Sequence, residues 1–265
     1  MRLVDVHFHP TDLALDQDLS MVMTRADKSN VVAALATGFD EESNGRILDL
    51  ADEHPQLGAA VGIHPWFLPT SLPPRLDSLA SQLANPHVVA LGEIGLDGKI
   101  ETPIDVQKHW FVAQLDLARQ HGLPVVVHSR RAFEQTWDCV RQVPGVRGIL
   151  HSFGGSPELA QRFIEQGWMI SFSGSVTRPR ARRIHRLAQA LPASSIVLET
   201  DAPSIGMDGL DAGEVEPCHL PLVLHSLAVL RETSARLLAR QTLLNSADIL
   251  PRWSRIAGLL EQVTT

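Results

Sequence analysis

The sequence predicts a single (β/α)8 barrel that occupies residues 1–265. Eight short apolar runs follow one another along the chain, and a longer segment with helical spacing of its apolar residues follows each of them. No linker, internal repeat or change of composition divides the series, and 44% hydrophobic residues are ample for one core. The runs are almost continuously apolar, as in a parallel sheet with both faces covered. An open doubly wound sheet has the same local pattern, and the count of eight favours closure.

The first half of the chain is expected to supply four strand–helix units. The strands are predicted at residues 4–9, 31–36, 59–64 and 88–94, and the second run ends at the turn signal Thr37-Gly38. The helices are predicted at residues 15–26, 42–53, 74–83 and 103–121. Thr102 is suited to the N-cap of the fourth helix, and Pro103 is suited to its first helical position.

The second half repeats this pattern and then adds a helical tail. Strands are predicted at residues 124–128, 146–151, 168–172 and 196–201, with helices at 132–142, 157–166 and 180–191. Ser156-Pro157-Glu158 is a typical helix start, and Gly167 is a typical stop. The tail at residues 234–263, broken by Pro251, is expected to form two helices packed outside the barrel.

Composition excludes several classes of protein. Cys139 and Cys218 lie far apart without metal-binding spacing, which argues against a disulfide framework and for a reducing compartment. The first nine residues carry Arg2, Asp5 and two histidines, unlike a signal peptide, and no apolar run is long enough to span a membrane. We therefore expect a cytoplasmic protein without a membrane partner, and a monomer is compatible with the sequence. A net charge of −7 argues against a protein that coats nucleic acid, although a local basic patch is allowed.

Residues of the types that bind metal ions gather at the predicted strand ends. His7 and His9 are two residues apart on one strand, so their side chains point to the same face. Further candidates close the third, fourth, fifth, sixth and eighth strands: His64, Glu93, His128, His151 and Asp201. In a (β/α)8 barrel the C-terminal ends of the strands build the active site, so these side chains are expected to converge at one mouth.

Six segments of the chain, taken together, resemble the TatD-like metal-dependent hydrolases of the amidohydrolase type. These segments occur in the family's order over nearly the whole chain: His7-Phe8-His9, Gly62-Ile63-His64-Pro65, Gly92-Glu93-Ile94-Gly95-Leu96-Asp97, 123–130, His151-Ser152-Phe153-Gly154-Gly155 and 198–203. The resemblance implies a TIM barrel with a metal centre, in a family with several members described as deoxyribonucleases.

The resemblance also implies roles for individual residues. His7, His9 and Asp201 are expected to hold one ion, and His128 and His151 a second. Glu93 is expected to bridge the two ions, and His64 to bind substrate phosphate rather than metal.

The chemistry of these side chains agrees with hydrolysis assisted by two divalent ions. Mixed imidazole and carboxylate ligands suit zinc, manganese or magnesium, and the sequence does not choose among them. Paired ions generate hydroxide from water near neutral pH and stabilise the attacking and leaving oxygens. Asp201 is the candidate general base, with a role as ligand alone as the alternative, and Glu93 takes the place of the carbamylated lysine of some related barrels.

Two loops depart from the family pattern. The family commonly has Leu-Asp after the second histidine, whereas here Pro10-Thr11-Asp12 displaces the acid by two positions. An aromatic residue commonly follows the aspartate at Asp97, whereas here Gly98-Lys99 follows. The resemblance therefore does not extend to contacts between these loops and substrate, while the ligand set is intact.

The nature of the substrate is open among three hypotheses. Arg130 follows His128 by two positions and is expected to meet a phosphate at the ions, while Arg131 is expected to turn away. Arg178 is expected at the rim together with Arg130, whereas Arg182, Arg183 and Arg186 suit a solvated helix face. The first hypothesis is a nuclease acting on DNA ends. The overall acidity favours the second, a small-molecule hydrolase of amides, lactones or esters, and the third is an inactive metal-binding scaffold.

Overall fold

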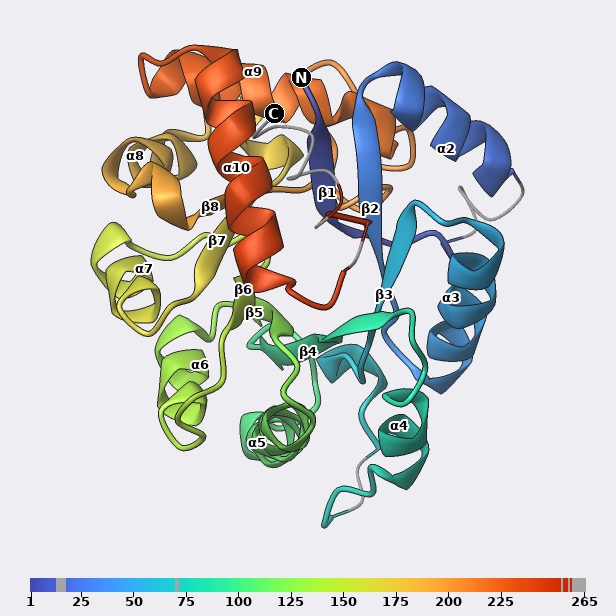
Figure 1. Cartoon of the computed structure of the whole chain (residues 1–265). Coiled ribbons are helices and arrows are strands. Elements are labelled where there is room, and N and C mark those ends of the chain that lie inside the picture. Colours follow the sequence, from blue (N-terminus) through green and yellow to red (C-terminus); the bar gives the residue numbers. More distant parts are fainter. Residues whose placement is uncertain (13–17, 70–71, 254, 257, 259–265) are drawn as a thin grey trace.

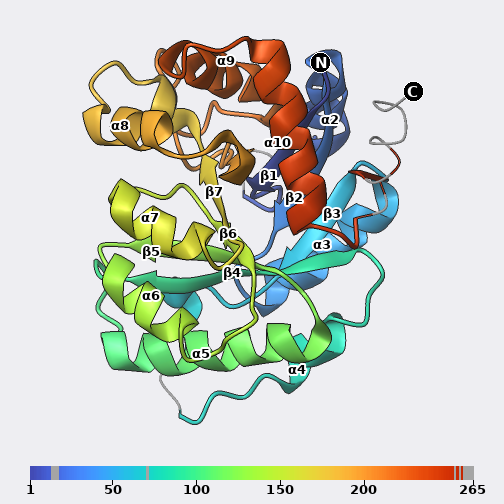
Figure 2. The ribbon, with the colours of Figure 1, turned by 60° about the vertical axis from the view of Figure 1, so that its left-hand side comes forward.

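Eight parallel strands form one sheet in the computed structural model, which describes residues 1–12, 18–69, 72–253, 255–256 and 258. Neighbours in the sheet are neighbours in the chain, and helices surround the strands (Figures 1 and 2). The strands are β1 (Leu3–Phe8), β2 (Val31–Thr37), β3 (Leu57–Val61), β4 (Val88–Asp97), β5 (Val125–Arg130), β6 (Gly148–Leu150), β7 (Met169–Phe172) and β8 (Ile196–Leu198). A parallel bridge between Phe8 and Ala202 joins the chain after β8 to β1. The predicted (β/α)8 barrel is therefore confirmed, and the open-sheet alternative is wrong.

In the described part of the chain, one α-helix follows each of the first seven strands. These helices are α2 (Leu19–Lys28), α3 (Glu41–Glu53), α4 (Asp77–Gln82), α5 (Ile104–His121), α6 (Phe133–Val140), α7 (Pro157–Ile164) and α8 (Arg182–Ala190). Ser156 caps α7 as predicted, because its Oγ accepts a hydrogen bond from the Leu159 N–H at 3.2 Å. The N-cap prediction for Thr102 is wrong, since Pro103 is the N-cap residue of α5 and no side chain caps it. Gln107 instead donates its amide N–H to the Thr102 carbonyl at 2.7 Å. Residues 15–17 of the predicted helix 15–26 lie outside the described residues.

The chain after β8 differs from the prediction in two respects. Helix α9 (Leu220–Leu230) was not predicted, because its sequence is apolar on almost every face and shows no helical period. Helix α10 (Ala235–Ile249) confirms the first tail helix, and it crosses in front of the barrel in Figure 1. The second predicted tail helix falls largely outside the described residues.

The tail closes the N-terminal end of the barrel rather than packing only outside it. Leu243, Leu250 and Trp253 join one buried cluster with residues of the barrel interior such as Val4 and Val126. Trp253 lies so close to the start of β3 that a Cβ on Gly58 would stand 2.8 Å from its indole ring. With this end filled by apolar side chains, the polar residues of the barrel are left to its C-terminal end.

A second apolar layer lies between the strands and the helices around them. Phe111 of α5 and Phe163 of α7 are completely buried in it. This layer fixes the strand positions from outside while the inner cluster fills the barrel from within. Among the described residues, no helix is both long enough and apolar enough to cross a membrane.

Candidate metal centre

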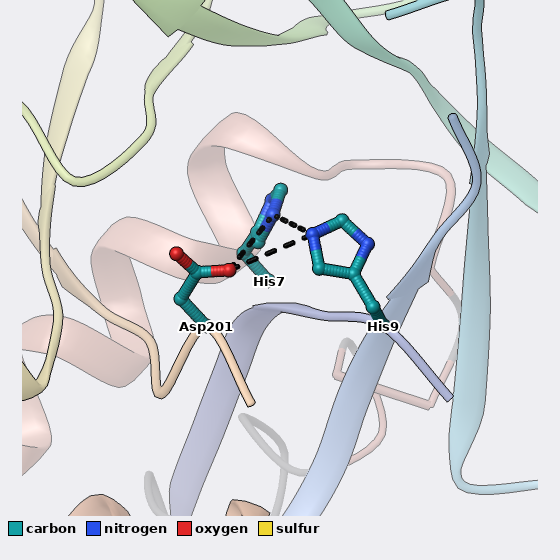
Figure 3. Close-up of side chains that lie close together, drawn as sticks. All are labelled: His7, His9 and Asp201. Atoms are coloured by element: carbon teal, nitrogen blue, oxygen red, sulfur yellow. Dashed lines mark hydrogen bonds and ion pairs between the residues drawn. The ribbon is translucent and has the colours of Figure 1, made fainter. Parts of the chain in front are cut away.

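Closure of the barrel brings His7, His9 and Asp201 together. The Asp201 N–H donates to the His7 carbonyl at 3.0 Å, and the His9 N–H donates to the Ala202 carbonyl at 2.8 Å. As a result the Nε2 atoms of His7 and His9 lie 3.1 Å apart (Figure 3). Oδ1 of Asp201 lies 3.7 Å from the first of these atoms and 3.5 Å from the second. These buried ligand atoms face one point, as the ligands of a single cation do.

Glu93 lies between this group and a second one. Its Oε2 is 3.5 Å from Nε2 of both His7 and His9. Its Oε1 points the other way and lies 3.0 Å from Nδ1 of His128 and 3.6 Å from Nε2 of His151. Each carboxylate oxygen therefore meets its own set of imidazoles, which is the arrangement a bridging ligand needs. The strand positions differ from the expectation, because Glu93 and His128 lie inside β4 and β5 and both strands continue past them.

His64 is also part of the second group. It follows β3 by three residues, and its Nε2 lies 3.5 Å from Oε1 of Glu93. Ligand atoms of His64, Glu93 and His128 lie within 4.8 Å of one another, as do those of His7, Glu93 and His151. The distances alone would fit His64 as a metal ligand, but its Nδ1 accepts a hydrogen bond from the Trp66 backbone N–H at 3.2 Å. The proton of the neutral ring therefore lies on Nε2, which suits a donor to phosphate, the expected role, rather than a metal ligand.

Three acceptors outside the cluster orient the imidazoles. Nδ1 of His9 lies 3.0 Å from the Thr37 carbonyl, and Nδ1 of His151 lies 3.1 Å from Oε1 of Glu199. Nε2 of His128 lies 3.3 Å from Oδ2 of Asp97. Each acceptor can hold a proton on the outer nitrogen, so that with metal bound the inner nitrogen would offer its lone pair to the ion.

None of these outer acceptors has a role predicted from the sequence. Glu199 precedes Asp201 by two residues, and this spacing would place both carboxylates on the same face of a strand. Asp97 meets His128 because β4 and β5 pair Gly95 with His128 and Asp97 with Arg130. A Cβ on Gly95 would lie 2.0 Å from the His128 carbonyl oxygen, so only glycine allows this close pairing.

The charge balance of the centre favours bound cations. Burial lowers the pKa of His7 to about 4 and that of His64 to about 3, which leaves both imidazoles neutral near pH 7. Burial also acts on His151, but the carboxylates of Glu199, Asp201 and Glu93 outweigh it and raise the pKa of His151 to about 10. Burial raises the pKa of Asp201 well above its ordinary value, and the Glu199 and Glu93 carboxylates add to this effect.

The negative charge of the nearby carboxylates favours a proton on His151. A bound divalent cation would supply the positive charge in place of that proton. The donor set of imidazole nitrogens and carboxylate oxygens therefore fits divalent metal ions of the zinc, manganese or magnesium kind.

A cavity of about 940 Å³ opens above the cluster. Its lining includes three arginines, Arg130, Arg131 and Arg183. It also includes Asp12, the acid displaced from the family position, and the aromatic side chains Phe39, Trp66 and Phe67. The expectation that Arg131 turns away is wrong, because β5 ends at Arg130 and the left-handed φ of 53° at Arg131 breaks the alternation of sides.

The division of the arginines after β7 also needs correction. Arg183 lines the cavity, with its guanidinium carbon 5.9 Å from the centre of the Phe133 ring. Arg178 is not among the lining residues and donates to the Gly206 carbonyl at 2.8 Å. Arg183, rather than Arg178, is therefore the rim arginine of this segment.

Comparison with known proteins places this chain in a family. Residues 4–251 match the model of the TatD related DNase family. The metal-dependent hydrolase YjjV of Escherichia coli K12, itself described as uncharacterized, is 33% identical over 94% of this chain and 97% of its own length. The 3'-5' ssDNA/RNA exonuclease TatD of Erwinia tasmaniensis is 30% identical over 92% and 96%. The crystal structure of the Escherichia coli YjjV protein superimposes with a TM-score of 0.89 at 31% identity, over 94% of this chain and 98% of that one. The chain therefore belongs to the TatD related DNase family of metal-dependent hydrolases.

Proposed function

We propose that this protein is a divalent-metal-dependent nuclease that hydrolyses phosphodiester bonds at DNA ends. The observation that carries the proposal is the Glu93 carboxylate, which lies between two sets of ligand atoms at the floor of a cavity lined by arginines. A family relative named as a 3'-5' ssDNA/RNA exonuclease supports this choice of substrate. When bound, two divalent ions would lower the pKa of an attacking water and neutralise charge on the phosphate and leaving group.

The side chains of the centre would divide the remaining work. His7, His9 and Asp201 would hold one ion, His128 and His151 the other, and Glu93 would bridge them. Asp201 is also the proposed general base, because its Oδ2 faces His151 at 3.7 Å while its Oδ1 faces the His7 and His9 pair. His64 and Arg130 would contact the scissile phosphate from the cavity wall.

The arginines of α8 favour a polymeric substrate over a small molecule. Arg182, Arg183 and Arg186 are exposed and lie within an arc of about 100° on the helix surface. None of these three forms an ion pair with any residue in the described ranges. A DNA strand that leaves the cavity past Arg183 would next meet Arg182 and Arg186. Its further phosphates would then lie beside unpaired positive charges, although the net charge of the whole chain is −7.

The test is cleavage of a 5'-labelled single-stranded oligonucleotide by the purified protein with Mg²⁺, Mn²⁺ or Zn²⁺. We expect stepwise shortening from one end, abolished in Asp201→Asn, with an affinity that falls steeply as salt is raised. The small-molecule hydrolase replaces this proposal if no DNA is cut in any metal while a neutral ester, lactone or amide is hydrolysed. The cytoplasmic location and the monomeric state stay predictions.

A further inference from the structure

Two aromatic side chains are exposed at the rim of the metal cavity. Trp66 is 54% exposed and Phe67 is 45% exposed, and both line the cavity above the cluster. The other four of the five tryptophans are 8% exposed or less. Single exposed apolar side chains are ordinary on a protein surface. Exposed aromatic rings that lie together at one cavity instead indicate a binding surface.

Both rings are held in place from behind. The Trp66 indole N–H donates to Oδ2 of Asp97 at 2.7 Å, and the Arg130 guanidinium lies 5.5 Å from the centre of the same ring. Phe67 stacks on Phe39 with ring centres 4.9 Å apart and planes 26° apart. The rings are thus preorganised, and a ligand that stacks on them would not have to order them first.

This aromatic surface lies directly beside the metal ligands. The ring of His64 is 5.2 Å from that of Trp66 and 6.4 Å from that of Phe67, centre to centre. The same imidazole places its Nε2 3.5 Å from Oε1 of Glu93. One imidazole therefore separates the exposed aromatic rings from the point where a scissile phosphate would lie.

We infer that Trp66 and Phe67 form a stacking platform for the base of the nucleotide whose phosphate lies at the metal centre. The inference rests on the proposed nuclease function, and it names what the enzyme holds besides the phosphate. The platform requires a free base face, and bases inside a duplex have both faces stacked. The enzyme therefore selects unpaired ends, through rings that accept any base.

The first experiment measures binding without catalysis. Because Trp66 is the exposed tryptophan, thymidine 5'-monophosphate added to the metal-loaded protein is expected to quench part of the tryptophan fluorescence, whereas 2-deoxyribose 5-phosphate is not. Trp66→Phe keeps a ring at this position and is expected to lose the quenching, since the four buried tryptophans do not face the ligand. Equal quenching by both phosphates, or none by either, overturns the platform.

The second experiment measures the same contact in turnover. The wild-type protein is compared on single-stranded oligonucleotides whose terminal nucleotide carries a base or is abasic, and loss of the base is expected to raise KM about tenfold. In Phe67→Ala this ratio is expected to shrink toward one, whereas Leu237→Ala, an exposed apolar position on α10, is expected to keep it. An unchanged ratio in Phe67→Ala, or a ratio near one in the wild type, overturns the inference.

The two proposals fail in different ways. A wild-type protein that cuts no oligonucleotide in any metal contradicts the nuclease function, and the fluorescence experiment then decides the platform by itself. A protein that cuts base-bearing and abasic ends with equal KM retains the nuclease function and loses the platform.

Discussion

Nε of Arg130 lies 3.0 Å from Oδ1 of Asp97, so the rim arginine expected to meet phosphate is tied to a completely buried carboxylate. The other oxygen of Asp97 accepts from the Trp66 indole and faces Nε2 of His128. Burial would raise the pKa of Asp97, but hydrogen bonds from His128, Trp66 and Arg130 outweigh it and hold this pKa below its usual range. One carboxylate thus joins the cavity wall to His128 of the candidate metal centre.

Asp97→Asn is expected to weaken metal binding on the His128 side of the centre. The amide keeps the shape of the side chain but cannot hold the His128 proton or the Arg130 charge as a carboxylate does. Loss of such an outer partner typically costs about 10-fold to 100-fold in metal affinity. Calorimetric metal titration would show one weakened site, and Asp116→Asn, which alters an exposed ion pair with Arg119, serves as the control. Two sites with wild-type affinity would contradict this role of Asp97.

Although both arginines line the cavity, Arg130→Ala is expected to reduce cleavage of DNA ends more than Arg131→Ala, because Asp97 holds the Arg130 guanidinium beside His128. A charged hydrogen bond to phosphate contributes about 1–3 kcal/mol, which corresponds to a loss of roughly tenfold to hundredfold in kcat/KM. Metal content is expected to stay unchanged, because Asp97 still reaches His128 in the variant. Arg141→Ala, which removes an exposed guanidinium paired with Asp138, controls for loss of charge alone. Equal rates for Arg130→Ala and Arg131→Ala would remove Arg130 from substrate binding.

The order of the strands and the approximate positions of the candidate ligands followed from the sequence because both depend on local periodicity. An apolar run that ends in His or Asp places that residue near the C-terminal end of its strand whatever its neighbours are. The contact between Asp97 and His128 depends instead on the stagger of β4 against β5, which no single segment encodes. The direction of the Arg131 side chain was not predicted for a similar reason. It follows from the left-handed φ at this residue rather than from the alternation of side chains along a strand.

Helix α9 escaped prediction for a different reason. Its residues Leu220, Val223, Leu224 and Leu227 are completely buried, while Leu222 and Val229 are exposed but equally apolar. A helix with apolar residues on both its buried and its exposed faces has no period for a sequence pattern to reveal.

Glu93→Gln is expected to reduce metal binding from two ions per chain to one or none and to lose most activity. The amide preserves the size of the side chain but removes the charge that both ligand sets share. Inductively coupled plasma analysis of protein equilibrated with metal would measure the stoichiometry. Glu53→Gln, at the exposed end of α3, should bind like the wild type. Two tightly bound ions in Glu93→Gln would refute the bridge.

Asp201→Asn is expected to lower kcat by orders of magnitude while the fold persists. The amide cannot accept a proton from water, and it presents a weaker ligand oxygen to the His7 and His9 pair. Circular dichroism and the melting temperature of the metal-free variant would report the fold, and single-turnover cleavage would report the rate. A variant with bound metal and a near-normal rate would show that Asp201 is neither the base nor an essential ligand.

Removal of metal is expected to abolish activity and to destabilise the protein, and both effects should reverse when metal is restored. Without cations, Glu93, Glu199 and Asp201 share one buried region in which the pKa of His151 rises to about 10 and that of His128 is also raised. Metal that binds only the folded chain adds about 2.7 kcal/mol of stability when its free concentration is 100 times Kd. For a chain of this size each kcal/mol shifts Tm by about 2–4 °C, so chelator should lower Tm by several degrees. Glu93→Gln should show a smaller chelator shift than the wild type, because fewer ions are there to remove. Full activity in protein freed of metal, or an equal Tm with and without chelator, would contradict a metal centre built from these residues.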